Sequence, residues 1–373
     1  MSSSAIQNTF DQSQCRYCSV TSKANGEDPI GTAIAADLWI MIEVPRPWTK
    51  NPWQEEATEL LALFAALEKR PRLWAKTQIL AIASDRGYSK PGYRHVLCYR
   101  RPNRLFAKYD PDQYCVPTEA IADLVKALLF QRSRLSAYDA YRQLAVRSLF
   151  VCTHTHYDVA CGRFGTPLYK TLRRYYAVDD QLQVWQTAHF GGHNFAPTLM
   201  DFPIGQFWGH LEPDILDVLV YRIGDVTQLR QFYRGWSGLS RWAQIVEREV
   251  WMQVGWEWLE IPKTERILAK DRGKLLHWLL RWLLRWVPII RAQVLLKKLD
   301  QKLNWAKVEI RAGDAKEGMS AICRGRVEVS HTVMTQLRSG KAKDLHPVKQ
   351  YQVRLKGDRQ YIQLHSVENR KQP

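Results

Sequence analysis

Hydrophobic and polar residues alternate along the first third of the chain in blocks that predict strands and helices in turn. Apolar residues recur at helical spacing in residues 54–69 and 118–131, with Thr118 as the expected N-cap of the second helix. Continuous apolar runs predict three strands, at residues 37–44, 77–84 and 95–100. Strands that alternate with helices predict a small α/β layer in which helices cover a sheet.

The same kind of pattern returns after residue 140. A strand at residues 145–152 is followed by a loop at 153–165 and a helix at 166–178, for which Thr166 is the expected N-cap and Pro167 the first residue. A strand at 183–188 and a hairpin at 196–211, around the turn Pro203-Ile204-Gly205, complete the unit. This order predicts a compact thioredoxin-like arrangement, to which the first unit is a possible relative.

The last third begins with an unusually apolar segment. In residues 274–299, His277, Arg281 and Arg285 recur every four residues beside tryptophans, which gives a narrow basic stripe on an apolar helix. Such a helix either lies in a membrane interface or packs on the protein, kinked or divided at Pro288. Short strands are expected after it, in the sequences WAKVEI, GRVEVSHTV and VKQYQVRL.

Composition and charge narrow the class of protein. The 373 residues are 46% hydrophobic and 24% charged, as in ordinary globular proteins, with a marked excess of 15 Trp. Of the formal net charge of +17, residues 263–373 contribute +15, from 25 Lys and Arg against 10 Asp and Glu. A basic region of this kind suggests an acidic protein or an anionic membrane surface as partner. It has too few aromatic residues for a stacking platform, so specific nucleic-acid binding is not expected.

Targeting signals and catalytic motifs are missing from the sequence. The N-terminus lacks the basic and apolar regions of a secretory signal, and no run of 18 or more uncharged apolar residues exists. A cytoplasmic location is therefore expected, with peripheral membrane association left open. No nucleophile motif, carboxylate pair or nucleotide loop argues for a catalyst with its own substrate.

Seven cysteines are an odd number spread over a long chain, which does not suggest a disulfide framework. Cys98 and Cys323 lie in apolar or strand-like runs and are expected to be buried structural residues. Cys15 and Cys18 form a CxxC pair near a polar terminus, without a second pair to complete a metal site. A thiol-redox enzyme that uses these two cysteines is one alternative.

Two further cysteines are placed to meet two histidines. Cys152 ends one predicted strand and Cys161 follows nine residues later, while His189 and His193 come directly after the next strand. If the two strands are parallel neighbours, both connections leave the same end of the sheet and the four side chains converge. Two thiols and two imidazoles suit zinc or a [2Fe-2S] cluster. The long spacing between the cysteines and the nearby glycines favour the larger cluster, whose sulfides backbone N-H groups could approach.

Several stretches carry a family resemblance. CTHTHYDVACGRFGTPLYKTLR and AHFGGHNFAPTLMDFPIGQFWGHL resemble the paired signatures of the sucrase/ferredoxin-like proteins. Upstream, YCSVTSKANGEDPIGTA and WIMIEVPRPW resemble the family's N-terminal signature, in which Cys18 falls on a Cys-Ser pattern. RGWSGLSRWAQIVEREV and VKQYQVRL are weaker matches. The resemblance covers most of the chain.

The resemblance implies a thioredoxin-like ferredoxin domain whose [2Fe-2S] cluster is bound by Cys152, Cys161, His189 and His193. Two neutral imidazoles in place of thiolates raise the reduction potential, and their second nitrogen can couple electron transfer to pH. We expect the cysteines to hold one iron and the histidines the other. The protein is then an electron carrier with unknown donor and acceptor proteins. The "sucrase" part of the family's description has no support in the sequence.

Three regions follow from these arguments. Residues 1–140 form an α/β N-terminal unit, residues 141–262 the ferredoxin domain, and residues 263–373 the basic C-terminal region with an amphipathic helix and short strands. The main alternative is a structural zinc site with the same four ligands, which would make the chain an interaction module. In the loop after Cys152, His154 and His156 are expected to lie beside the metal or in solvent.

Overall fold

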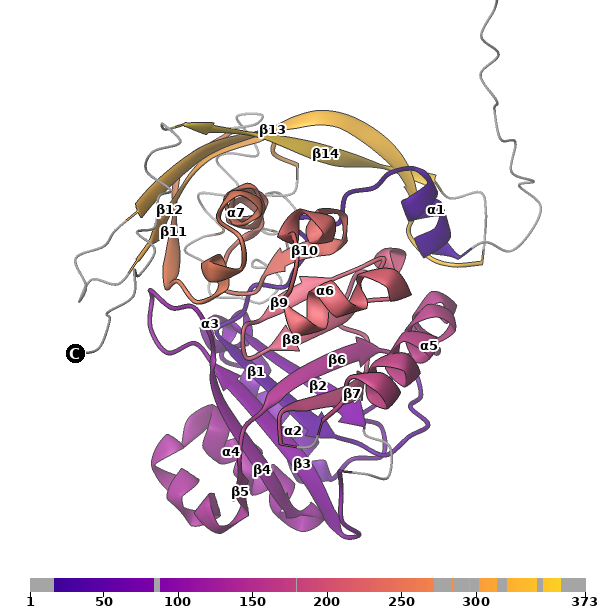
Figure 1. The fold of residues 1–373 in the computed structure, drawn as a ribbon. Helices are drawn as coiled ribbons and strands as arrows, with labels where there is room; N and C mark the ends of the chain where they lie inside the picture. Colours follow the sequence, from indigo (N-terminus) through magenta and orange to yellow (C-terminus); the bar gives the residue numbers. More distant parts are fainter. Residues whose placement is uncertain are drawn as a thin grey trace, which may run out of the picture.

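The structure is a computed structural model that describes residues 17–83, 88–178, 180–271, 302–313, 321–340 and 345–356, and residues 284 and 295 singly. Within these residues the fold is mixed α/β, with a ten-stranded mixed sheet and a four-stranded antiparallel sheet. The large sheet forms the body of the molecule, and the small sheet arches over one side of it (Figure 1).

The first part of the chain supplies one half of the large sheet. In chain order its elements are α1 (Cys18–Ala24), β1 (Leu38–Glu43), α2 (Thr58–Glu68), α3 (Pro71–Trp74), β2 (Thr77–Ala83), β3 (Tyr93–Arg100), β4 (Asp110–Pro117), η1 (Thr118–Ala120), α4 (Ile121–Phe130), η2 (Arg132–Tyr141) and β5 (Arg142–Gln143). The three predicted strands and two predicted helices are present. The α4 helix is capped at Ala120, so the prediction of Thr118 as its N-cap is wrong, because a 3-10 turn begins at that residue.

The middle of the chain supplies the other half. Its elements are β6 (Arg147–Cys152), α5 (Val159–Tyr175), β7 (Leu182–Thr187), η3 (His193–Phe195), β8 (Leu199–Phe202), β9 (Gln206–Trp208), η4 (Pro213–Ile215), α6 (Leu216–Tyr221), η5 (Val226–Phe232), β10 (Tyr233–Trp236), α7 (Arg241–Val254) and η6 (Trp256–Leu259). The predicted strands and the hairpin of β8 and β9 are confirmed.

The helix after β6 begins seven residues earlier than its sequence pattern suggests. It starts at Val159 with Asp158 as N-cap, whose side chain accepts a hydrogen bond from the backbone N-H of Ala160. Pro167 therefore lies inside the helix, and the prediction of a helix start at Thr166 is wrong. As a consequence, Cys161 lies in the first turn of α5 and not in a loop.

The two halves of the large sheet repeat one strand order. β1 is parallel to β2 and antiparallel to β3, which pairs with β4; β6 is parallel to β7 and antiparallel to β8, which pairs with β9. Antiparallel pairing of β2 with β7 joins the halves into one continuous sheet. The division into domains near residue 140 stays a prediction.

Burial on both faces explains why β1 reads as a continuous apolar run. Leu38, Ile40 and Ile42 belong to a core with residues of α2 and α4. Trp39 and Met41 point to the opposite face, into a larger core that also contains residues of α5, α7 and the small sheet. The sheet is thus covered on both sides, as strands without polar alternation require.

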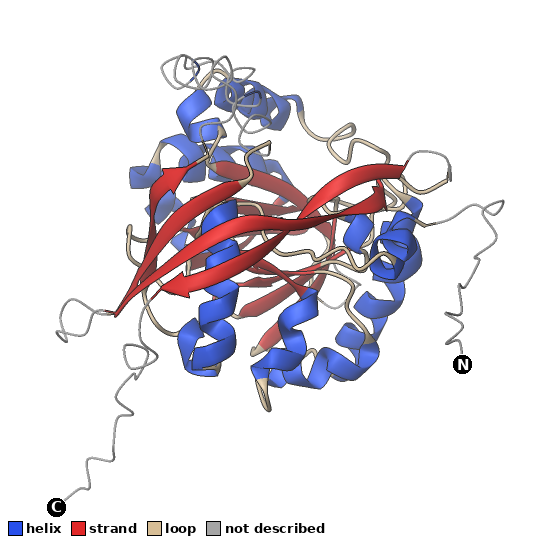
Figure 2. Cartoon of the chain, turned by 90° about the horizontal axis from the view of Figure 1, so that it is seen from above, coloured by secondary structure: helices blue, strands red, loops and turns tan. Residues whose placement is uncertain are grey.

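The last described elements form the small sheet, in the order β11 (Lys263–Lys270), β12 (Trp305–Ala312), β13 (Ala321–Gln336) and β14 (Leu345–Lys356). Its strands include the three predicted from the sequence. Long antiparallel strands cross over α7, and β13 also contacts α1 (Figures 1 and 2). The predicted amphipathic helix at residues 274–299 lies outside the described residues, apart from two single positions. None of the described helices combines the length and apolar character needed to cross a membrane.

Candidate metal centre

The candidate donors meet at one end of the large sheet. β6 and β7 are parallel neighbours in register, with Cys152 opposite Thr187, which is the condition under which the sequence predicts that the four side chains converge. Cys152 is the last residue of β6, and His189 comes two residues after the end of β7. The first turn of α5 brings Cys161 to the same place.

Cys152, Cys161 and His189 form a close group whose ligand atoms all lie within 4.8 Å of one another. Nδ1 of His189 lies 3.9 Å from Sγ of Cys152 and 3.7 Å from Sγ of Cys161. Both thiols are about 1% exposed, whereas His189 is half-buried. The donors are therefore shielded on their sulfur side and accessible on their imidazole side.

The pKa values of the two thiols are shifted in opposite directions. Burial raises the pKa of Cys152, but hydrogen bonds from Cys161 and His189 to its thiolate outweigh burial and hold this pKa well below its usual range. The pKa of Cys161 is raised, because its thiol donates to the Cys152 thiolate and is buried. Cys152 is therefore the thiol that loses its proton more readily, and a metal ion that binds here would displace any proton that remains.

His193 lies beside the first group and has its own partners. Its Nδ1 is 3.3 Å from Sγ of Cys18 and 3.4 Å from a carboxylate oxygen of Asp158. These three residues form a second group of close donors. The rings of His189 and His193 have centroids 5.3 Å apart, so the two groups adjoin. Burial lowers the pKa of His193, which favours the neutral, ligand-competent imidazole.

Residues from both ends of the described chain hold Asp158. The hydroxyl of Ser339 donates to Asp158 at 2.6 Å, and the backbone N-H of Ser339 donates to the other carboxylate oxygen at 3.0 Å. These hydrogen bonds lower the pKa of Asp158 despite its burial, which by itself raises it. Cys18 donates its backbone N-H to the same hydroxyl at 3.1 Å. α1 and the end of β13 are thereby tied to the start of α5.

Cys18 is a poor candidate for a reactive thiol in this setting. It is fully buried, and burial raises its pKa to about 12. A thiol with this pKa is almost entirely protonated at neutral pH, and it is the thiolate that attacks disulfides. Its predicted partner Cys15 lies outside the described residues.

His154 fixes the position of His189 without facing the thiols. Its Nδ1 accepts a hydrogen bond from the backbone N-H of His189 at 3.3 Å, and its Nε2 donates to the carbonyl of Thr49 at 2.7 Å. These bonds assign the neutral tautomer with the proton on Nε2, in agreement with a pKa lowered by burial. His156 is exposed. The expectation for these two loop histidines is consistent with this placement.

Two glycines of the signature stretches are required by close packing. A Cβ at Gly165 would lie 1.9 Å from the carbonyl oxygen of Cys152, so this glycine lets α5 approach β6. Gly192 has a φ of +78° and a Cβ there would lie 2.5 Å from Nη2 of Arg234. Room for bridging sulfides beside the glycines stays a prediction.

The sequence did not single out several residues that shape this site. Tyr157 stacks on His189 with ring centroids 3.8 Å apart and an interplanar angle of 15°, and it is 37% exposed. Arg234 lies behind the histidine loop, and Ser339 comes from the far end of the chain. Only the RGW of the signature beginning at residue 234 could have pointed to one of them, whereas the contact of Ser339 depends on tertiary structure.

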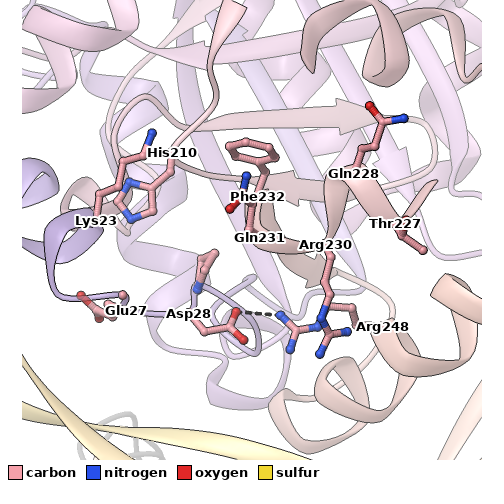
Figure 3. A pocket seen from close by; sticks show the side chains of 12 residues that line it. Lys23, Glu27, Asp28, His210, Thr227, Gln228, Arg230, Gln231, Phe232 and Arg248 are labelled. Carbon is pink, nitrogen blue, oxygen red and sulfur yellow. Dashed lines mark hydrogen bonds and ion pairs between the residues drawn. The ribbon is translucent and has the colours of Figure 1, made fainter. Parts of the chain in front are cut away.

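A separate concavity of about 530 Å³ lies beside α1, η5 and α7 (Figure 3). Arg248, Lys23 and Arg230 contribute cations to its lining. Each is paired with a carboxylate: Arg248 with Asp28 at 2.7 Å, Lys23 with Glu212, and Arg230 with Glu249 at 2.8 Å. None of the four predicted ligands lines this pocket. It is therefore distinct from the cysteine and histidine site.

Comparison with known proteins places the chain in a family. No curated protein and no solved structure matches it. The model of one family, described as sucrase/ferredoxin-like, matches residues 29–235. This segment holds all four predicted ligands together with Asp158 and Arg234, while Cys18 and Ser339 lie outside it. Because the match covers more than half of the chain, the protein belongs to the sucrase/ferredoxin-like family.

Proposed function

We propose that the protein is an iron-sulfur electron carrier whose [2Fe-2S] cluster is bound by Cys152, Cys161, His189 and His193. The observation that carries this proposal is the division of the donors into two adjoining groups. Three donors lie within 4.8 Å of one another, and His193 belongs to the neighbouring group. A single zinc ion with bonds of about 2.0–2.3 Å needs all four donors within about 4 Å of one another. Donors spread over a longer distance suit two metal ions better.

The surroundings of His193 also support its role as a ligand. Its Nδ1 faces the carboxylate of Asp158, which leaves Nε2 for a metal. Metal-bound histidines usually donate their second ring N-H to a carboxylate or carbonyl, which fixes the ring and raises its basicity. For His189, Nδ1 faces the two sulfurs. The two histidines therefore differ in the ring nitrogen that each offers.

The protein's own residues define what such a centre can do. When bound, a cluster of this type supplies reversible one-electron chemistry at a raised potential. Because the two thiols are buried, water is kept away from the sulfur ligands. The half-buried imidazoles and the exposed Tyr157 form the path for electrons to the surface. The carboxylate of Asp158 can accept a hydrogen bond from Nδ1 of His193, and loss or gain of the proton on this nitrogen would link electron transfer to pH.

The strand order supports a thioredoxin-like arrangement for the ferredoxin part. β9, β8, β6 and β7 lie side by side in this order, with α5 connecting the parallel pair β6 and β7. The order β4, β3, β1, β2 repeats it in the N-terminal unit. We propose that the chain holds two such units, of which only the second carries the ligands.

We propose an acidic redox protein as partner. The segments that hydrogen bonds join at Asp158 carry exposed apolar side chains, namely Val20, Tyr157, Val159 and Leu337. Among the described residues of these segments the exposed charges are basic: Arg163 and Arg338, together with Lys23, which is paired with Glu212. An apolar centre with a basic rim suits a small, transient, electrostatically guided interface. The six described cysteines are free thiols, which fits the proposed cytoplasmic location.

The test is the metal content and spectrum of the full chain, purified without oxygen. We expect iron and acid-labile sulfide in equal amounts, a visible absorption spectrum, and after dithionite an EPR signal with the low average g of nitrogen-ligated clusters. A colourless protein with one equivalent of zinc would instead support the alternative, a structural zinc site in an interaction module. Protein with neither metal would refute both.

Variants identify the ligands. Replacement of His193 by Cys should keep iron but lower the potential and raise the average g, because a thiolate adds negative charge. His156→Ala is the matched control, since this exposed histidine lies in the loop after Cys152 and should leave the spectrum unchanged. Equal spectra for His193→Cys and the wild type would remove His193 from the ligand set.

A further inference from the structure

A buried cation lies behind the loop that carries the two histidines. Arg234 in β10 is 1% exposed. Its guanidinium donates to the carbonyl of Gly191 at 3.1 Å, to Oγ1 of Thr32 at 3.0 Å and to the carbonyl of Thr32 at 3.0 Å. All three acceptors are neutral. Within the part of the chain that the structure describes, Arg234 forms no ion pair with a carboxylate.

Aromatic rings complete the surroundings of this guanidinium. The rings of Phe190, Phe195 and Phe207 have centroids 5.9, 5.7 and 5.8 Å from its Cζ. Their faces attract a cation and exclude water, but they carry no net charge. A charge buried among neutral groups is strongly unfavourable unless an opposite charge lies nearby. A nearby negative charge would therefore stabilise the buried guanidinium of Arg234.

Negative charge in the candidate site would meet this requirement, because the guanidinium is held against the loop that joins His189 and His193. Burial lowers the pKa of Arg234 to about 10, and negative charge on Cys152 and Cys161 opposes this effect. The guanidinium thus keeps its charge at neutral pH. It is also held close to the ligand loop, because Gly191 and Gly192 lie between the two histidines and contact it directly.

We propose that Arg234 is the fixed counter-charge of the redox centre and favours its reduced state, an inference that rests on the proposed function. With two thiolates and two neutral imidazoles as ligands, the oxidised cluster is formally neutral, and reduction adds one negative charge. The step is the transfer of one electron from an external donor to the cluster, with no bond broken. A positive charge fixed in a water-poor environment stabilises the reduced state and raises the reduction potential.

The packing of Gly192 keeps this cation in place. A Cβ at position 192 would meet both Nη2 and Cζ of Arg234, at 2.5 and 2.6 Å. Any larger residue would displace either the guanidinium or the loop that holds His193. Arg234 is therefore a positioning residue for charge, since it touches the ligand loop and no ligand atom.

The experiment is a potentiometric titration with dithionite, followed by EPR, on full-length protein purified without oxygen. Arg234→Gln should lower the equilibrium constant for one-electron reduction about tenfold or more, which is about 59 mV in potential. Arg234→Lys keeps the charge and should stay close to the wild type. Arg163→Gln removes an exposed charge two residues from Cys161 and is the matched control, expected to leave the potential unchanged.

Each outcome decides the proposal. An iron-loaded Arg234→Gln protein with the wild-type potential overturns it, as does an Arg234→Lys protein that shifts as far as Arg234→Gln. If Arg234→Gln loses its iron, Arg234→Lys decides between the two roles. Full iron content and the wild-type potential in Arg234→Lys would support the role of the charge. Loss of iron in Arg234→Lys as well would show that Arg234 is needed only for the structure, which overturns the proposal. Wild-type protein without iron contradicts the proposed function itself.

Discussion

The protonation state of a buried histidine follows from its neighbours, and His210 gives a direct test. It is 6% exposed, its Nε2 lies 3.1 Å from the hydroxyl of Ser22, and its backbone φ is +55°. Burial lowers its pKa to about 3, with smaller contributions from Lys23 and Arg234. The folded protein therefore keeps this imidazole neutral where the unfolded chain protonates it.

We predict that His210 destabilises the fold in acid. Between an unfolded pKa of about 6.5 and the native value, the unfolded chain binds one more proton, so the free energy of unfolding falls as the pH decreases. The slope reaches about 1.4 kcal/mol per pH unit for one proton. His210→Asn tolerates the positive φ and cannot titrate, so its urea-measured stability should fall less steeply from pH 6 to pH 4. Exposed His331→Asn is the control, and parallel curves for His210→Asn and the wild type would contradict the prediction.

A second prediction concerns the close approach at Gly165. Glycine to alanine within a helix normally stabilises by up to about 1 kcal/mol. Here the added Cβ would lie 1.9 Å from a backbone oxygen of β6, which cannot move aside as a flexible side chain does. We expect Gly165→Ala to lower the free energy of unfolding by about 1–3 kcal/mol. It should also reduce the iron content of the proposed centre, because it separates Cys161 from Cys152. A variant with a raised free energy of unfolding and full iron content would contradict this prediction, because it would show that α5 and β6 can move apart without cost.

At the scale of elements, the sequence predicted the strands of the large sheet better than the limits of its helices. Buried strands such as β1 can be recognised in the sequence by their unbroken apolar runs. The assumption that β6 and β7 are parallel neighbours led to the correct prediction that Cys152 and His189 meet. The start of α5 was missed because Thr166 and Pro167 look like a helix start, whereas Asp158 forms the cap. The local preference for a helix start at Thr166 was outweighed by the N-cap at Asp158, whose carboxylate also accepts hydrogen bonds from Ser339.

The C-terminal part shows a different limit. Strands were expected from alternating polarity in the segments that became β12, β13 and β14. Their place in the molecule was not predictable, because pairing and packing across more than 300 residues leave no local signal. The hydrogen bond between Cys18 and Ser339 spans 321 positions. For the same reason, the meeting of Cys152, Cys161 and His189 could be predicted from spacing, whereas the neighbours of Asp158 could not.

The cap at the start of α5 leads to a third prediction. Asp158→Ala removes the N-cap, the bonds from Ser339 and the carboxylate beside His193, so we expect a loss of about 1–3 kcal/mol in the free energy of unfolding. Asp158→Asn keeps a good cap and should lose less stability. Urea unfolding measures both. Asp225→Ala removes an exposed cap of η5 and serves as the control; a loss in that variant equal to the loss in Asp158→Ala would assign the effect to capping alone.

At the scale of the whole molecule, two exposed arginines near the histidines lack, within the part of the chain that the structure describes, the carboxylate partners that several arginines of the small sheet have. On the small sheet, Arg311 and Arg324 both contact Glu309, and Arg354 contacts Glu328. Around the histidine end, the exposed Arg163 and Arg338 have no such partner among the described residues. An anionic partner should therefore be attracted most strongly to the surface next to the proposed metal centre.

The fourth prediction tests this asymmetry by electron transfer to small inorganic oxidants. The reduced protein should react more slowly with the anion ferricyanide as the salt concentration rises, because salt screens the attraction between them. The relevant range of ionic strength is the one over which the Debye length shortens from about 30 to 8 Å. With cationic hexaammineruthenium(III), the rate should rise with salt instead. The double variant Arg163→Glu, Arg338→Glu should reverse both trends, because charge near the exit governs the encounter. The control Arg324→Glu, Arg354→Glu makes the same change in net charge on the small sheet. If both double variants behave alike, net charge and not the histidine face steers the approach.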